Sequence, residues 1–365
     1  MTSRTAAAER VGWILLALAI GLLCGPLGCA STRIGATLVL PPTTIVGDPT
    51  GRNRDIYDAY ELFDRGDKAY VGAEWEKATL NYNKILKEYP DSEVAPLARY
   101  NLGLVNEQTG QWEKALRVYR EFPNPPGRGV LIEEVRMRAG VCLVKLERYA
   151  EAEKEFESIL SQFGVSPLIF NEARARLGIA AYYAGDEVLA EHHLEMALPE
   201  NDRNLQRGIV HARAAYAEGY FIMGEIYYRR FAAVALGGEE AALALDLREK
   251  AEYLIAARDY YTQAVRTYEP LWITAALYKI GLGFEEFYRA VLAVPEPRDL
   301  PADERAGYRE KLEKKLYPVL DKALTAYRRN LQLAADLGQN NQWVQWTREH
   351  YELLSRLTSQ EEPKP

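Results

Sequence analysis

Residues that could carry out chemistry are scarce in this sequence. Those that most often bind metals or transfer protons are four histidines and three cysteines among 365 residues: His192, His193, His211, His350, Cys24, Cys29 and Cys142. Neighbouring residues on a helix point about 100° apart, so the adjacent His192 and His193 cannot hold one metal ion together. The sequence contains neither His-Glu-x-x-His nor a pair of Cys-x-x-Cys motifs. It therefore predicts no metal site.

Motifs for phosphate binding and nucleophilic catalysis are also missing. Gly281-Leu-Gly283 is a fragment of a dinucleotide fingerprint that lacks a third glycine and a preceding strand. Acidic pairs such as Glu133-Glu134 lie in long helical stretches, where a solvated face explains them. An active site hidden in the two insertions described below is a third hypothesis, without a visible nucleophile–base pair. We expect a protein that is not an enzyme and has no cofactor.

Composition and charge narrow the class of partner. The chain is 48% apolar and 27% charged, as globular proteins are, and carries a net charge of −7. An acidic chain has no electrostatic reason to bind a polyanion, so we expect no nucleic acid partner.

The N-terminal residues have the pattern of an export signal. Residues 1–10 are mildly basic, residues 11–24 carry no charge, and residues 25–26 break the apolar run. This run is short for a bilayer span of about 20 residues and suits a signal peptide over 1–28. The following Gly28-Cys29 resembles a bacterial lipobox, which implies lipid attachment at Cys29. A signal cleaved without lipid, or an uncleaved anchor using residues 11–29, remain alternatives.

The residue after the cysteine bears on location. Ala30 stands where enteric bacteria place an aspartate to retain lipoproteins in the inner membrane. The resemblance therefore favours an outer membrane lipoprotein that faces the periplasm. Residues 29–54 have prolines and no helical period, which predicts an extended tether. Cys142 lies in an apolar helical stretch and is expected in the core.

From Asp55 onward the sequence repeats. A glycine is followed twelve residues later by an alanine, and an aromatic residue or leucine follows that alanine by four. This pattern occurs four times, with glycines spaced by 37, 37 and 38 residues: Gly66/Ala78/Tyr82, Gly103/Ala115/Tyr119, Gly140/Ala152/Phe156 and Gly178/Ala190/Leu194. Two further copies, Gly224/Ala257/Tyr261 and Gly281/Ala323/Tyr327, contain insertions near 231–250 and 292–316. We expect the glycine and alanine to meet where two helices cross.

The pattern resembles the tetratricopeptide repeat, a pair of antiparallel helices with small residues at its eighth and twentieth positions. The resemblance implies an all-α protein, a right-handed α-solenoid of about six hairpins over 55–338. A capping helix over about 342–357 and a disordered tail would complete the chain within 339–365. The Tyr89-Pro90 step after a helix is similar to repeats of bacterial envelope lipoproteins, including BamD-like proteins.

The resemblance also implies a binding surface. In this family the fifth, ninth and twelfth positions of each first helix line the concave side. The apolar residues there are candidate partner contacts: Phe63, Tyr70, Tyr100, Leu104, Met137, Val141, Ile179, Tyr182, Phe221, Tyr228, Tyr278 and Leu282. Acids also occupy such positions, but no lysine, arginine or asparagine does, so the carboxylate clamp of chaperone-binding members is absent. We expect an amphipathic helix or an extended apolar segment as ligand.

Two functions of the same general kind follow. The first is a non-catalytic scaffold that holds envelope proteins for outer-membrane assembly or secretion. The second is a binding module that coordinates cell-wall or polysaccharide synthesis and export. The sequence does not separate them.

Overall fold

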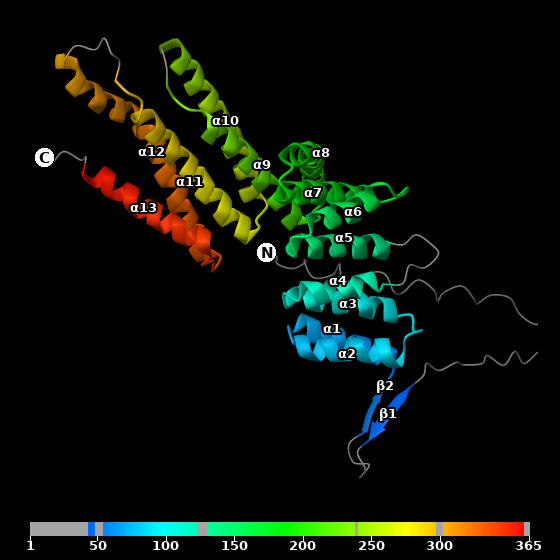
Figure 1. Ribbon diagram of the computed structural model, residues 1–365. Coiled ribbons are helices and arrows are strands. Elements are labelled where there is room, and N and C mark those ends of the chain that lie inside the picture. The colour runs from blue at the N-terminus through cyan, green and yellow to red at the C-terminus, as the bar shows by residue number, and fades with distance from the viewer. Residues whose placement is uncertain (1–42, 48–53, 123–129, 238–239, 297–301, 361–365) are drawn as a thin grey trace, which may run out of the picture. The chain divides into compact units, whose positions relative to one another are not determined.

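The computed structural model describes residues 43–47, 54–122, 130–237, 240–296 and 302–360. The predictions of a signal peptide over 1–28 and of lipid at Cys29 lie outside the described residues, as does most of the predicted tether. Within the described residues the chain forms thirteen α-helices and one β-hairpin. The prediction of an all-α solenoid of stacked helix hairpins is confirmed (Figure 1).

Twelve of the helices form six consecutive hairpins, here called units 1 to 6. Their bounds are α1 Ala59–Val71 and α2 Trp75–Glu88; α3 Ala95–Gln108 and α4 Trp112–Arg120; α5 Val130–Lys145 and α6 Tyr149–Leu160; α7 Pro167–Ala184 and α8 Glu187–Gln206; α9 Arg213–Ala233 and α10 Glu240–Arg266; α11 Pro270–Leu292 and α12 Ala302–Asp336. The two helices of each unit contact one another, and each unit contacts the next. The thirteenth helix, α13 Gln342–Gln360, packs on α11 and α12.

Local sequence sets where several helices begin and end. Asp58 accepts a hydrogen bond from the backbone N–H of Glu61 at 2.8 Å and so caps α1, and Asp186 caps α8 in the same way. Gly185 ends α7 with φ of 91°, a left-handed conformation that glycine adopts without steric penalty.

Each repeat glycine faces the large side chain that follows the alanine of its second helix by four residues, and Gly178 also faces the Ala190 carbonyl oxygen. A Cβ atom added to Gly103 would lie 2.2 Å from Cε1 of Tyr119, and one added to Gly281 would lie 2.3 Å from Tyr327. The other four repeat glycines face Tyr82, Phe156, Leu194 and Tyr261 in the same way. The large side chain of each second helix therefore lies against its own first helix at the one place without a side chain.

The insertions of units 5 and 6 mainly lengthen helices. The second helices α10 and α12 have 27 and 35 residues, against 9 to 20 in units 1 to 4. Lys250 of α10 is 5% exposed and donates to the carbonyls of Phe231 and Val234 at 2.8 and 2.9 Å. A buried ammonium thus satisfies the free carbonyls where α9 ends.

A β-hairpin precedes unit 1, which the sequence analysis did not anticipate. Strands β1 Thr44–Gly47 and β2 Arg54–Tyr57 are antiparallel, with Ile45 opposite Ile56. The Tyr57 side chain is 3% exposed, and its hydroxyl donates to Glu88 at 3.0 Å. Arg65 of α1 pairs with Asp55 of β2 at 2.9 Å, and the Tyr89 hydroxyl donates to the Tyr57 carbonyl at 3.2 Å. Several side chains of unit 1 therefore hold the hairpin in place.

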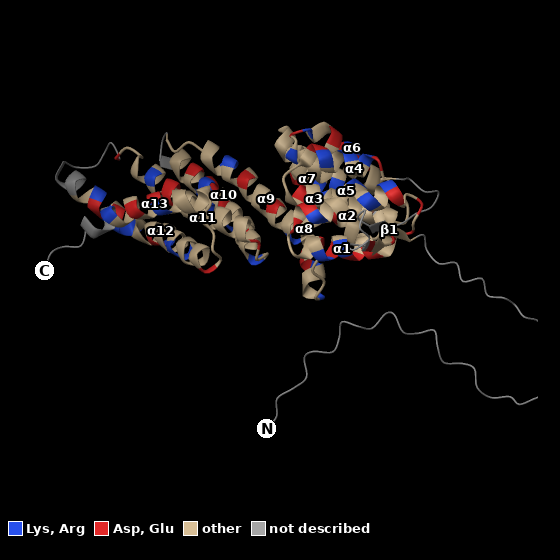
Figure 2. Cartoon of the chain, turned by 90° about the horizontal axis from the view of Figure 1, so that it is seen from below, with Lys and Arg blue, Asp and Glu red and all other residues tan. Residues whose placement is uncertain are grey.

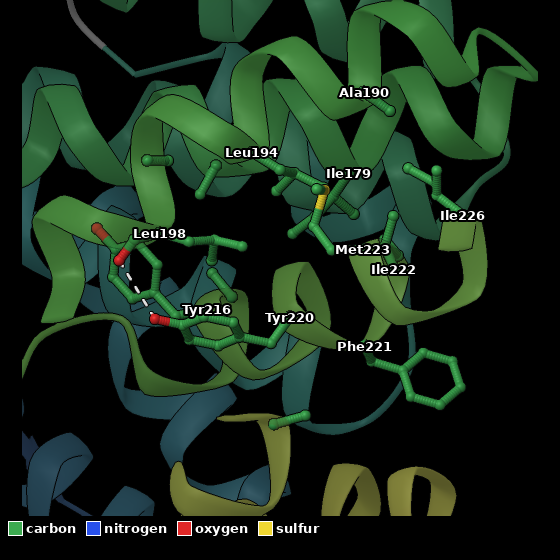
Figure 3. Close-up of a cluster of buried hydrophobic side chains, with 14 of the residues drawn as sticks. Ile179, Ala190, Leu194, Leu198, Tyr216, Tyr220, Phe221, Ile222, Met223 and Ile226 are labelled. Atoms are coloured by element: carbon green, nitrogen blue, oxygen red, sulfur yellow. Dashed lines mark hydrogen bonds between the residues drawn. The ribbon is translucent and has the colours of Figure 1, made fainter. Parts of the chain in front are cut away.

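The core runs through the units as a series of buried clusters. Figure 3 shows the cluster of units 4 and 5, in which Ile179 and Leu194 lie near Met223, and the hydroxyl of Tyr220 donates to the carbonyl of Leu198. Cys142 is fully buried in the cluster of unit 3, as expected.

Candidate partner-binding surface

The twelve predicted contact residues share a position in their units but differ in burial. They lie three residues before, one after or four after the repeat glycine of a first helix. Eight are half-buried: Phe63, Tyr70, Tyr100, Leu104, Val141, Tyr182, Tyr228 and Leu282. Met137, Ile179, Phe221 and Tyr278 are buried. We call the half-buried eight the first-helix row. That they contact a partner stays a prediction.

Helix α13 covers two of the buried four. Trp343 of α13 lies 5.8 Å, ring centre to ring centre, from both Phe221 and Tyr278, and Trp346 lies 5.7 Å from Tyr278. Trp272 of α11 contacts Phe221 of the preceding unit at 5.0 Å. Trp343 of α13 makes the corresponding contact with Tyr278 of α11. These two positions are inside the fold.

Neighbouring rings fix several side chains of the first-helix row. Tyr70 packs edge-on against Trp75 at 5.5 Å, and Tyr100 lies 6.3 Å from the buried Tyr119. Three hydroxyls of the row are already bonded to adjacent helices. Tyr100 donates to Glu134 at 3.3 Å, Tyr228 donates to Glu286 at 2.6 Å, and Tyr182 accepts from Arg229 at 3.0 Å. The first-helix row therefore offers a partner aromatic rings for packing rather than hydroxyl groups for hydrogen bonding.

The acids at the same positions of the first helices are engaged within the chain. In unit 1, Asp67 accepts hydrogen bonds from the Tyr82 hydroxyl at 2.6 Å and from Nδ2 of Asn101 at 2.9 Å. Tyr82 belongs to the second helix of the unit, and Asn101 belongs to the first helix of the next unit. We call this arrangement of tyrosine, carboxylate and next-unit donor a polar junction.

Three more polar junctions repeat this arrangement. In unit 2, Glu107 accepts from Tyr119 at 2.5 Å and pairs with Arg138 at 3.3 Å. In unit 5, Glu225 accepts from Tyr261 at 2.5 Å and pairs with Lys279 at 2.9 Å. Asn101, Arg138 and Lys279 all stand two residues before a repeat glycine.

The junction of unit 6 connects it to α13. Glu285 is 1% exposed and accepts from the Tyr327 hydroxyl and from Nδ1 of His350, each at 2.8 Å. Arg289 pairs with its other oxygen at 2.6 Å. Burial raises the pKa of Glu285, but the hydrogen bonds from His350 and Tyr327 outweigh it and leave this pKa below its usual range. His350 thus does for α13 what Lys279 does for α11.

At the junction of unit 2 the pKa of the acid is shifted in the opposite direction. Burial raises the pKa of Glu107 above its usual range, although Arg138 and the Tyr119 hydroxyl both favour the charged form. Burial also raises the pKa of Tyr119, with the Glu107 charge adding to the effect. The tyrosine therefore keeps its proton and acts as donor.

Units 3 and 4 have no polar junction. The ring of unit 3 is Phe156, and the residues one and four after its glycine are Val141 and Val144. Arg176, two residues before the next repeat glycine, pairs instead with Glu172 of its own helix at 2.7 Å. In unit 4 the same places hold Leu194, Ile179 and Tyr182, and Ile222 takes the donor position.

The Glu172 carboxylate forms a separate buried network. It pairs with Arg176 and, at 2.7 Å, with Nε2 of His211 in the loop between α8 and α9. Burial raises the pKa of Glu172, but Arg176 and His211 lower it to about 2. The hydrogen bond to Glu172 raises the pKa of His211. The pair fixes this loop to α7.

The described residues contain no group of three or more His, Cys, Asp and Glu side chains that could hold a metal ion. Burial raises the pKa of the Cys142 thiol to about 12, which disfavours the nucleophilic thiolate. No described helix is both long and apolar enough to cross a membrane.

Sequence reasoning placed the carboxylates on the binding side but missed their partners. It also missed the aromatic contacts of α13. The signal was available in the chain. Each unit with a tyrosine four residues after its repeat alanine has an acid one or four residues after its glycine, and the two units with Phe156 or Leu194 at that place have none.

The comparisons with known proteins agree with this geometry. Residues 97–124, which cover most of unit 2, match the family model described as tetratricopeptide repeat. The other units show the same hairpin, and their repeat glycines face a ring of the second helix, or Leu194 in unit 4. The fold thus defines a helical-repeat solenoid, and residues 97–124 within it are similar to the tetratricopeptide repeat. A comparison with curated proteins finds no relative that matches the sequence.

Similar solved structures are distant in sequence. A tetratricopeptide repeat protein from Parabacteroides merdae is 13% identical, with a TM-score of 0.38, over 81% of this chain and 98% of that chain. A repeat protein of the same kind from Bacteroides fragilis is 15% identical, with a TM-score of 0.32, over 82% and 99%. The TPR2AB domain of yeast Sti1, solved as a complex with pHSP90, is 14% identical, with a TM-score of 0.32, over 73% and 98%.

Proposed function

We propose that this chain is a non-catalytic scaffold that binds protein segments along its first-helix row. The single observation that supports this proposal is the row itself. Eight apolar or aromatic side chains recur at fixed positions of successive first helices and remain half-exposed. A core position would be buried, and an ordinary surface position would be polar.

The junction chemistry narrows the partner. Asp67, Glu107, Glu225 and Glu285 each accept from a tyrosine and a second donor of the chain, so they do not offer free charge to a basic peptide. The ligand we propose is an amphipathic helix or extended segment with apolar anchors, which packs on rings.

We further propose that lipid on Cys29 tethers the scaffold to the bacterial envelope, facing the periplasm at the outer membrane. This rests on the apolar run before Cys29 and on Ala30 after it. In that place the scaffold would serve envelope assembly or secretion, as BamD-like proteins do. Mass spectrometry of the N-terminus tests the tether: a diacylglyceryl Cys29 supports it, and an N-terminus that retains residues 1–28 contradicts it.

Site-specific photo-crosslinking in whole cells tests the binding surface. A photoreactive amino acid at Tyr70, Tyr100 or Tyr182 is expected to capture the same envelope protein. The matched control is Leu80, which is 58% exposed on the second helix of unit 1. Capture from Leu80 as strong as from Tyr70, or none from the three tyrosine positions, would contradict the proposal.

A further inference from the structure

Two neighbouring loops in units 4 to 6 expose large apolar side chains. They are the connections of α8 with α9 and of α10 with α11. The exposed residues of these connections and of the helix ends beside them are Leu205, Ile209, Val210, Tyr268 and Leu271. Tyr268 is 78% exposed and Val210 is 58% exposed. We call these five residues, together with Arg207 and Arg266, the loop patch.

One ion pair joins these two loops, and a second fixes the first loop to α7. Arg213, at the start of α9, pairs with Glu269, just before α11, at 3.9 Å. His211 pairs with the buried Glu172 at 2.7 Å, which fixes the first loop to α7. Helix α9 also contacts both α10 and α11, so the two connections meet at Arg213 and Glu269.

Each loop contains a residue other than glycine in the left-handed region. Ala212 has φ of 45° and Tyr268 has φ of 61°. This conformation is unfavourable for a side chain as large as tyrosine. At Tyr268 it turns an aromatic ring toward solvent, where no packing within the described chain compensates for it. Such a residue is a candidate for an external contact.

The charge around these loops is opposite to that of the whole chain. Residues 203–213 and 266–271 contain four arginines and one glutamate, whereas the chain carries −7. Arg203 pairs with Glu200, and Arg213 pairs with Glu269. Arg207 and Arg266 have no acidic partner among the described residues. Elsewhere basic and acidic residues are interspersed along the helices (Figure 2).

The loop between units 1 and 2 makes the contrast clear. Residues 88–97 contain three acids and no lysine or arginine. Of their large aliphatic and aromatic side chains, Leu97 alone is exposed, at 42%. Loop position in the repeat therefore does not by itself produce a basic and apolar surface.

We propose that the loop patch lies against an anionic lipid surface. Tyrosine favours the headgroup level of a bilayer, aliphatic side chains enter just below it, and arginine pairs with phosphates. The patch offers all three groups on short loops. The proposal does not depend on lipid at Cys29 or on the first-helix row, and it would hold if either failed.

Hydrogen exchange of the full-length chain, reconstituted into vesicles, tests the proposal. One set of vesicles is phosphatidylcholine alone, and the other is an equimolar mixture with phosphatidylglycerol. We expect amides of 205–212 and 267–271 to exchange more slowly in the anionic vesicles. Those of 89–94 and 161–166, in two other loops between units, should not change.

Surface variants separate charge from apolar contact. Each arginine near an anionic surface contributes roughly fivefold to binding, so Arg207→Gln with Arg266→Gln should reduce the added protection by more than about tenfold. Ile209→Ser with Tyr268→Ser should abolish it. Arg117→Gln with Val188→Ser, which changes exposed residues of α4 and α8, is the matched control and should leave it intact.

Three results would overturn the proposal. The first is equal exchange of the patch in the two vesicle types. The second is protection that survives both pairs of patch substitutions. The third is protection that requires an added envelope protein extract, which would make the patch a protein-binding surface. Thermal unfolding of each variant verifies that the fold is retained.

Discussion

Units 2 and 3 use the same hairpin but fill equivalent positions with opposite chemistry. Around Gly103 the chain places Tyr119, the Glu107 carboxylate and Arg138 of the next unit in one hydrogen-bonded group. Around Gly140 it places Phe156 near two valines. The ring occupies the same space in both units, and its hydroxyl decides whether an acid is needed beside it.

This difference changes how acids on a repeat protein should be interpreted. An acid on the binding side of a first helix looks like a ligand contact when the sequence alone is considered. Here it serves the stacking of units whenever a tyrosine of the second helix faces the repeat glycine. The half-exposed rings are therefore better candidates for partner contacts than the carboxylates beside them.

The largest expected effect comes from removing the acid of a polar junction. Glu107→Val leaves the Tyr119 hydroxyl without its acceptor and leaves Arg138 with Glu134 alone, and should lower the free energy of unfolding by about 3 kcal/mol. Adding Tyr119→Phe recreates the apolar set of unit 3 and should recover part of that loss. Urea denaturation followed by circular dichroism measures both. No recovery in the double variant would show that the two chemistries are not interchangeable.

Filling the space of a repeat glycine should have the next largest effect. Gly103→Ala places a methyl group against the Tyr119 ring and should destabilise the protein by about 1–3 kcal/mol. Gly72→Ala is the matched control, because its new Cβ would meet nothing closer than 3.4 Å and should change stability by less than about 0.5 kcal/mol. Thermal unfolding compares them. Equal losses of stability in the two variants would show that the contact between Gly103 and the Tyr119 ring does not limit the size of the residue at this position.

The converse substitution should destabilise unit 3. Phe156→Tyr adds a hydroxyl where Val141 and Val144 offer no acceptor, at an expected cost of about 1–2 kcal/mol. Combining it with Val144→Glu supplies the acid found at this place in unit 2, and should restore stability. A neutral or stabilising Phe156→Tyr would contradict the pairing rule.

The two kinds of buried acid should respond to pH with opposite signs. The pKa of Glu172 is about 2, below its unfolded value of about 4.3, so its stabilising contribution is present above that value and is lost as pH falls toward 2. The pKa of Glu107 is raised by burial, so its contribution grows as pH falls. The stability difference between the native chain and Glu172→Gln should shrink on acidification. For Glu107→Gln, the stability of the native chain relative to the variant should instead increase as pH falls.

The sequence predicted the hairpins well because glycine, alanine and ring recur at fixed spacing within each unit. It predicted the site less well, because Trp343 covers Phe221 from far along the chain and no spacing rule links them. The β-hairpin was missed for a related reason. Its strands have four residues each, and Tyr57 fixes them through Glu88 of α2. Contacts within one unit are visible in the sequence, and contacts between distant elements are not.

A double-mutant cycle across one polar junction tests the central claim most directly. Glu225 and Lys279 lie 2.9 Å apart, with side chains 16% and 14% exposed, on the first helices of successive units. If such pairs hold the units together, unfolding of Glu225→Gln, Lys279→Met and the double variant should give a coupling energy of about 1–3 kcal/mol. A coupling energy near zero would show that the carboxylate does not serve unit stacking, and would make it a candidate for partner binding again.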